Sequence, residues 1–225
     1  MSVNIPSNAT SAGTYLSNAQ TWSTTQTFVF MCWFYLTGTP TNNDIFNAEG
    51  TNDVPYLLLT SNPQYDFGSL DSDNYVTSPI PVVGRWTHIC YVWIPSSTSK
   101  IRGYVNGNRV ITATSAGTVG SITSLTLGNQ NATDGATLGL GGNISDVRCW
   151  NQILSDAQVW QEYQSCRPVN KNGLVIWSPF DTEIYNNYVP GGKQWTAVTA
   201  GATPASLVAP MLTSRTWNKD LTRKI

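Results

Sequence analysis

Residues 84–110 hold the feature that most limits what this chain can fold into, the pair Asn106-Gly107 at the end of an aromatic-containing run. Asn-Gly is the strongest local signal for a β-hairpin, because a type I′ turn needs a positive φ at both central residues. The apolar run at residues 86–94 comes before it, and a short polar loop separates the two runs. The segment therefore predicts antiparallel strands and a tight turn.

The run at residues 28–35 is apolar on both faces that an extended strand presents. Side chains alternate between the faces of a strand, which puts Phe28, Phe30, Cys32 and Phe34 on one face and Val29, Met31, Trp33 and Tyr35 on the other. Residues 86–94 alternate in the same way, with Trp86, His88, Cys90, Val92 and Ile94 opposite Ile89, Tyr91 and Trp93. Such strands lie centrally in a sheet and are covered on both sides.

One short helix is predicted in an otherwise strand-rich chain. The polar residues are mostly Ser, Thr and Asn, which favour strands and turns over helices. Ser155-Asp156 is a helix N-cap pattern, and the helix is expected to run to about Gln164 and to end by Pro168. Residues 173–180 then predict a strand that returns to the sheet.

Several further segments follow one another in a fixed order. They are the strand at 28–35, the pair at 43–46 and 56–59, residues 124–128 ending in Leu-Gly, residues 142–151 with the sequence Gly-Asn-Ile-Ser-Asp-Val-Arg-Cys-Trp-Asn, and the helix at 154–163. Together with residues 84–110, this order resembles the laminin-G-like and pentraxin branch of the concanavalin A-like jelly rolls. The resemblance covers roughly residues 20–180. It implies an all-β, two-sheet antiparallel jelly-roll sandwich with one short helix. An extended C-terminal tail is expected to follow the sandwich.

The 225 residues suit a single sandwich with an arm at each end. We expect an N-terminal arm and first edge strand at 1–20, the sandwich at 21–180, and a tail at 181–225. The tail is too long for an ordinary connection, and it carries too many apolar groups to be freely solvated. It is expected to lie against its own sandwich or, beyond Pro204, against a neighbouring subunit.

Charge and hydropathy exclude two classes of partner. Charged residues make up 11% of the chain, with 12 Lys+Arg against 13 Asp+Glu, so no basic field is available for nucleic acid. No apolar run approaches the roughly 18 to 20 residues of a membrane span.

The first residues lack the basic cap and apolar core of a secretory signal. If Met1 is native, the protein is expected to be made and folded in a cytosol.

Catalysis is not expected. Glycosidases of the concanavalin A-like fold place two carboxylates on one strand, and no strand here is expected to show two acids on one face. His88 is the only histidine, so histidine-based nucleophilic machinery and zinc sites with several histidines are not expected. We interpret His88 as a structural sheet residue that hydrogen-bonds to its neighbours.

The resemblance to pentraxins bears on calcium, which those proteins bind after the Leu-Gly strand and through a distant Asp-Asn pair. Here residues 129–132 supply amides without a carboxylate, and the first acid is Asp134. A hard dication prefers several charged oxygens, so an intact double-calcium site is not expected. A single weakly held calcium ion near Asn131 and Asp134 is the alternative left open. No other cofactor is expected.

The resemblance also bears on Cys32 and Cys90, which occupy the two strands that carry the pentraxin disulfide. Their side chains are therefore expected to face each other on neighbouring strands. A disulfide and a pair of buried thiols both stay open, because the wider family often has Ala at these positions. Cys149 and Cys166 show no pairing pattern and are expected to be free.

Three tryptophans fall in predicted arms or loops, namely Trp22, Trp195 and Trp217. An exposed indole there is expected to stack on a sugar or to anchor a partner protein. The other strand tryptophans, Trp177 among them, are expected in the core.

Two classes of function remain. The first is a non-catalytic interaction protein of a bacteriophage virion surface, such as a capsid decoration or fibre protein, made in the host cytoplasm. It would be oligomeric, with protein subunits of a larger assembly and glycans as partners. The alternative is a carbohydrate-binding, lectin-like module of a cell-surface or secreted protein.

Overall fold

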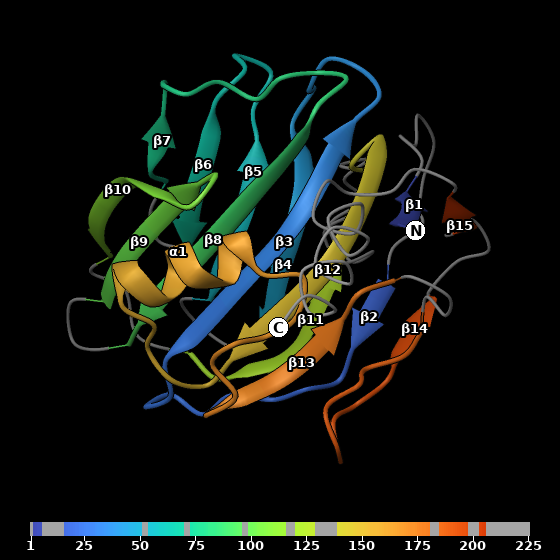
Figure 1. Cartoon of the computed structure of the whole chain (residues 1–225). Helices are drawn as coiled ribbons and strands as arrows, with labels where there is room; N and C mark the ends of the chain where they lie inside the picture. Colours follow the sequence, from blue (N-terminus) through green and yellow to red (C-terminus); the bar gives the residue numbers. More distant parts are fainter. Residues whose placement is uncertain are drawn as a thin grey trace, which may run out of the picture.

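The computed structural model describes residues 2–5, 16–50, 54–69, 73–95, 99–115, 120–128, 139–180, 185–197 and 203–205. These residues form fifteen strands and one helix (Figure 1). The elements are β1 (Ser2–Ile5), β2 (Leu16–Asn18), β3 (Phe28–Leu36), β4 (Asn43–Gly50), β5 (Pro55–Leu59), β6 (Tyr65–Ser69), β7 (Tyr75–Val76), β8 (Trp86–Ile94), β9 (Ser99–Val105), β10 (Asn108–Ser115), β11 (Ile122–Leu127), β12 (Gly142–Trp150), α1 (Asp156–Gln164), β13 (Leu174–Ser178), β14 (Trp195–Ala197) and β15 (Thr203–Ala205).

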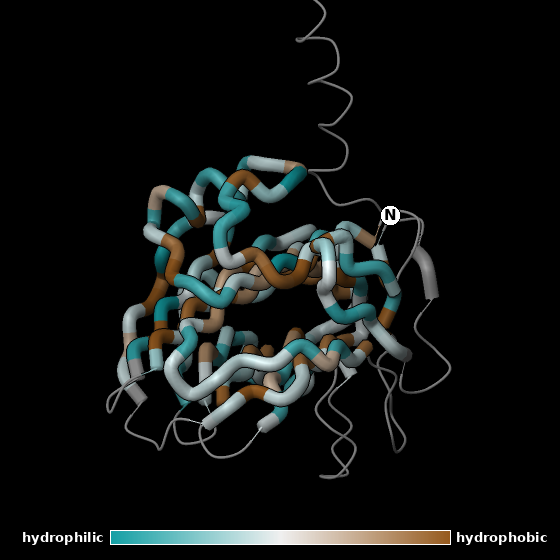
Figure 2. The backbone as a smooth tube through the Cα atoms, turned by 90° about the horizontal axis from the view of Figure 1, so that it is seen from below, coloured by the Kyte–Doolittle hydropathy of each residue, from teal (hydrophilic) through white to brown (hydrophobic). Residues whose placement is uncertain are grey.

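The strands build two sheets that pack face to face, as the view from below shows (Figure 2). The front sheet has the order β10-β9-β8-β3-β12-β1-β15, and β13 pairs with β12 as well. The back sheet has the order β14-β2-β11-β4-β5-β6-β7. The paired strands of both sheets run antiparallel, so the predicted all-β sandwich with a single short helix in the described chain is confirmed.

Strand β3 lies between β8 and β12, and both of its faces are buried. Phe28, Phe30, Cys32 and Phe34 face the core between the sheets. Val29 and Met31 lie on the other face in a second apolar cluster. It includes Trp150 of β12, Leu154 just before α1, and Val159 of α1. Figure 1 shows α1 crossing this outer face of the front sheet. The helix therefore supplies the second cover that the apolar pattern of β3 predicts.

The turn at Asn106-Gly107 joins β9 to β10, as the sequence predicts. Both residues have positive φ, 49° and 79°. The Asn106 side-chain oxygen accepts a hydrogen bond from the His88 backbone N–H at 3.0 Å, and the Asn106 N–H donates to the His88 carbonyl at 2.8 Å. The turn is therefore tied to β8 as well as to its own hairpin.

Both arms contribute strands to the sandwich. Residues 2–5 of the N-terminal arm pair with β12 as β1, and residues 16–18 pair with β11 as β2. From the tail, β14 pairs with β2 and β15 pairs with β1. These parts of the tail therefore lie against their own sandwich, and both sheets include strands from beyond residue 180. Residues 206–225 lie outside the described residues.

A buried ionic network ties α1 to the front sheet. Arg148 of β12 binds Asp146 through Nη2 at 2.5 Å and Nε at 3.1 Å, and it binds Glu162 of α1 through Nη1 at 2.6 Å. Its Nη2 also donates to the Ser165 carbonyl at 2.6 Å, just after α1. Asp146 has a φ of 52° within an irregularity of β12, which turns its carboxylate toward Arg148. All three side chains are almost fully buried.

The expectation that Cys32 and Cys90 face each other is wrong. The strands β3 and β8 are neighbours, but Cys32 pairs with Ile89 and Met31 pairs with Cys90. This offset of one residue puts Cys32 in the core between the sheets and Cys90 beneath α1. All four cysteines are free thiols, and burial raises the pKa of Cys32, Cys90 and Cys149.

We expect iodoacetamide to label Cys166 alone in the folded protein, because Cys166 is the cysteine that is not fully buried. Labelling in denaturant without reductant should modify all four thiols. Mass spectrometry of peptides measures both outcomes. A peptide pair linked through Cys32 and Cys90 would contradict the register of β3 and β8.

Replacing Arg148 by Met should lower the free energy of unfolding by about 3–5 kcal/mol, because two buried carboxylates would lose their counter-charge. Arg109→Met is the matched control. Its ion pair with Asp156 is 3.4 Å long and both side chains are about half exposed, so its loss should cost at most about 1 kcal/mol. Urea unfolding of both variants gives the comparison. Equal losses would mean that the buried network does not hold α1.

Candidate functional site

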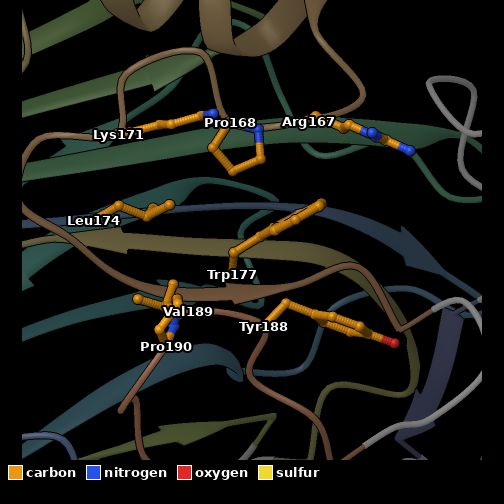
Figure 3. A pocket seen from close by; sticks show the side chains of 8 residues that line it. All are labelled: Arg167, Pro168, Lys171, Leu174, Trp177, Tyr188, Val189 and Pro190. Atoms are coloured by element: carbon orange, nitrogen blue, oxygen red, sulfur yellow. The ribbon is translucent and has the colours of Figure 1, made fainter.

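A cavity of about 430 Å³ opens beside α1 on the outer face of the front sheet. We call it the groove. Three segments line it, namely the loop after α1, the strand β13, and residues 188–190 (Figure 3). The lining residues are Arg167, Pro168, Lys171, Leu174, Trp177, Tyr188, Val189 and Pro190. Its volume falls in the range of small-molecule sites in proteins.

The floor of the groove is made by Leu174 and Trp177 of β13. Ile176 and Ser178 of the same strand are buried toward the core, so Trp177 between them points outward. The indole N–H of Trp177 donates to Asp146 Oδ1 at 3.2 Å. The buried ionic network therefore fixes the orientation of the floor.

The first wall, residues 167–171, is held by the buried carboxylate of Glu162. Its Oε1 accepts hydrogen bonds from the Val169 N–H at 2.9 Å, the Asn170 N–H at 2.6 Å and the Asn170 side-chain amide at 2.8 Å. The Asn170 carbonyl in turn accepts from the Trp150 indole at 2.7 Å. The loop is thus bound to both α1 and β12, which holds Arg167 and Lys171 at the rim.

The second wall, residues 188–190, is held by the buried side chain of Asn187. Its oxygen accepts from the backbone N–H groups of Trp177 at 3.0 Å and Val189 at 3.1 Å, and its nitrogen donates to the Val175 carbonyl at 3.0 Å. The Tyr188 N–H donates to the Trp177 carbonyl at 2.9 Å. A Cβ on Gly192 would lie 2.2 Å from the Asn187 amide nitrogen, so glycine is needed for this close approach.

The groove combines aromatic and cationic groups. The rings of Trp177 and Tyr188 lie 5.7 Å apart between centroids, tilted by 49°, and Tyr188 is 44% exposed. Arg167 and Lys171 are both exposed on the opposite edge from Tyr188 (Figure 3). Within the described part of the chain, neither cation has an ion-pair partner.

Trp22 and Trp195 do not have the exposed positions expected from the sequence. Each is only 2% exposed. The Trp22 ring packs edge-on against Phe28 at 5.1 Å, and the Trp195 indole donates to Ser178 Oγ at 2.8 Å inside the core. Trp22 forms a bridge to Ile122 of β11 and Trp195 lies in β14, so both rings are buried within the sandwich. Trp217 lies outside the described residues.

The expected calcium ligands Asn131 and Asp134 also lie outside the described residues, so that expectation stays a prediction. In the ranges that the structure does describe, no three His, Cys, Asp or Glu side chains are grouped closely enough to hold a metal ion. The same ranges contain no helix with the length and hydropathy to cross a membrane.

His88 is buried between aromatic rings, and one nitrogen of its imidazole has no hydrogen bond. This corrects the expectation that His88 hydrogen-bonds to its neighbours. Its ring lies 5.3 Å from those of Trp33 and Tyr163, and Nδ1 has no hydrogen-bond partner. Burial lowers the pKa of His88 to about 3, and the positive charge of Arg148 acts in the same direction. His88 is therefore a neutral packing residue beneath α1.

Sequence reasoning missed the groove because it placed Trp177 in the core. The alternation of residues 174–178 separates Trp177 from Ile176 and Ser178, but it does not say which face points outward. Arg167 and Lys171 precede this strand, but their place in the sequence alone does not say that they share a cavity with Trp177.

The comparisons with known proteins agree with this architecture. Residues 8–160 match the concanavalin A-like lectin/glucanases superfamily. The native heptameric SAP-like pentraxin from Limulus polyphemus superposes with a TM-score of 0.66 at 17% identity, over 93% of this chain and 95% of that one. A candidate carbohydrate-binding protein from Bacteroides ovatus superposes with a TM-score of 0.68 at 16% identity, over 93% of this chain and 61% of that one. Curated protein sequences give no match.

We expect acid to weaken the fold through His88. In the unfolded chain His88 takes up a proton near pH 6.5, whereas in the fold its pKa is about 3. The unfolded state therefore binds more protons between these values, and stability falls as the pH drops through this window, by up to about 1.4 kcal/mol per pH unit. His88→Phe should reduce this slope in urea unfolding between pH 7 and pH 4. Because His88 is the only histidine, an NMR ring signal that titrates above pH 5 would contradict its burial.

Proposed function

The chain belongs to the concanavalin A-like lectin/glucanases superfamily, and from this premise we propose that it is a non-catalytic β-sandwich that binds carbohydrate in the groove. The single observation that carries the proposal is the pair Trp177 and Tyr188 at an open, prearranged cavity. Aromatic rings present an apolar face on which the C–H face of a sugar ring packs, and their polar edges hydrogen-bond. The description of the Bacteroides ovatus protein as a candidate carbohydrate-binding protein supports the same class.

A glycosidase role is not supported by the acids of β4. An irregularity between Asp44 and Phe46 puts Asp44 and Glu49 on the same outer face of the back sheet, which corrects the expectation that no strand shows two acids on one face. They are four ladder steps apart, or about 13 Å at the usual rise of a strand. Glycosidase carboxyl groups lie about 5–9.5 Å apart. Asp44 is also almost fully buried.

A second pair of acids lies closer together on the same face. Asp66 and Asp73 both accept a hydrogen bond from the Tyr56 hydroxyl, and Asp73 accepts another from Tyr75 at 3.0 Å. Burial raises the pKa of Asp66 to about 6, a value that suits a general acid. Asp66 is only 1% exposed, however, so its carboxyl group cannot reach a substrate. The pair is a structural cluster at the β5–β7 edge.

The bacteriophage virion role, the assembly partners, the oligomeric state and the location stay predictions. Their sequence argument rests on the tail, of which residues 206–225 lie outside the described residues. The Limulus polyphemus pentraxin is a heptamer, and a similar native size for this protein would favour assembly. Light scattering of the purified protein distinguishes a many-copy complex from a monomer.

Tyr188→Ala should weaken carbohydrate binding by about 3- to 10-fold, the contribution expected of one aromatic contact. Tyr185→Ala is the matched control, because Tyr185 is 43% exposed and does not line the groove. Binding is measured on an oligosaccharide array and then by calorimetry with the strongest hit. Unchanged affinity in Tyr188→Ala, or no saccharide bound by the unmodified protein, would place the function elsewhere.

A further inference from the structure

We propose that the groove selects an anionic saccharide, one that carries carboxylate or sulfate groups, and that Arg167 and Lys171 bind those groups. This inference rests on the proposed carbohydrate binding and names the class of ligand. The two cations stand along one edge of the groove, and Tyr188 stands along the other (Figure 3). A sugar ring packed on Trp177 and Tyr188 would thus direct a ring substituent toward the cationic edge.

The acids beneath the groove do not compete for these cations. Asp146 is saturated by Arg148 and by the Trp177 indole. Both oxygens of Glu162 also have partners, Oε2 in Arg148 and Oε1 in the donors of residues 169–170. These carboxylates are buried below the floor, whereas the two cations are exposed at the rim. Among the described residues that line the groove, the charged groups open to an incoming ligand are therefore positive.

The two side chains suit different parts of an anionic group. The planar guanidinium of Arg167 matches two oxygens of a carboxylate or sulfate, and the ammonium of Lys171 acts as a point charge. The backbone around Arg167 is held in place, since its N–H donates to Ser165 Oγ at 3.3 Å and its carbonyl accepts from the same hydroxyl at 2.6 Å. The loop is thus set before the ligand arrives.

The gain in affinity from the two cations is limited because both side chains are exposed to solvent. Exposed ion pairs are each worth a few-fold in affinity at most, and salt screens them. Two of them should make an anionic saccharide bind about 3- to 30-fold more tightly than its uncharged counterpart at low salt. Raising the salt from about 25 to 250 mM should reduce this difference, because the Debye length shortens from about 19 Å to about 6 Å.

An array of neutral, carboxylated and sulfated oligosaccharides tests the proposal with the full-length chain, and calorimetry follows with the best anionic hit and its neutral counterpart. The double variant Arg167→Gln/Lys171→Gln should lose the preference for the anion and keep the binding of the neutral sugar. Lys100→Gln, an exposed lysine of β9 outside the groove, is the matched control and should keep the preference. Tyr188→Ala should weaken the binding of both the anionic and the neutral saccharide. The carboxylated and sulfated arms show which anion is preferred.

The outcomes separate the two proposals. Equal affinity for the anionic and neutral saccharides, or a preference that survives in the double variant, overturns the anionic inference and leaves carbohydrate binding intact. If the protein binds no saccharide, both the carbohydrate-binding proposal and the anionic inference are overturned. The same holds if it binds an oligoglutamate peptide but no saccharide.

Discussion

The buried guanidinium of Arg148 is the contact on which the rest of the helix side of this molecule depends. It neutralises Asp146 of its own strand and Glu162 of α1, so it joins the front sheet to the helix that covers it. Burial of two carboxylates is tolerated only with such compensation. The same two acids then orient the Trp177 indole and the loop at residues 167–171. Stability and the shape of the groove therefore have a common origin.

The sandwich itself is predictable from hydrophobic patterning. The two apolar faces of β3 require cover on both sides, and the structure provides the back sheet on one and α1 on the other. Register is not predictable in this way. Alternation assigns Cys32 and Cys90 to faces within their own strands, but the offset between β3 and β8 decides that these faces are opposite. Knowing that the two strands are neighbours is therefore not enough to predict whether their cysteines face each other.

The groove was less predictable, because its parts come from segments that only the fold brings together. The residue types of Trp22 and Trp195 suited ligand contact, yet both rings are buried. Trp22 forms a bridge to Ile122 of β11, and Trp195 lies in the edge strand β14. Trp177 was expected in the core, yet its side chain points to the outer face of the front sheet beside α1. Tyr188 depends on Asn187, whose amide bonds reach β13. The sequence shows which aromatic residues are present, but the packing of the fold decides which of them are exposed to solvent.

The way in which the walls are held favours binding over catalysis. The side chains of Glu162 and Asn187 are fully engaged in hydrogen bonds that hold the two walls and, for Glu162, the Arg148 guanidinium. Neither side chain therefore offers an atom to a substrate. A groove fixed in this way loses little conformational entropy when a ligand enters, and weak individual contacts then add up to measurable affinity. The exposed side chains that could contact a ligand, Tyr188, Arg167 and Lys171, are aromatic or cationic, and such groups stack on rings and attract anions. This construction of the groove supports the proposed role in carbohydrate binding.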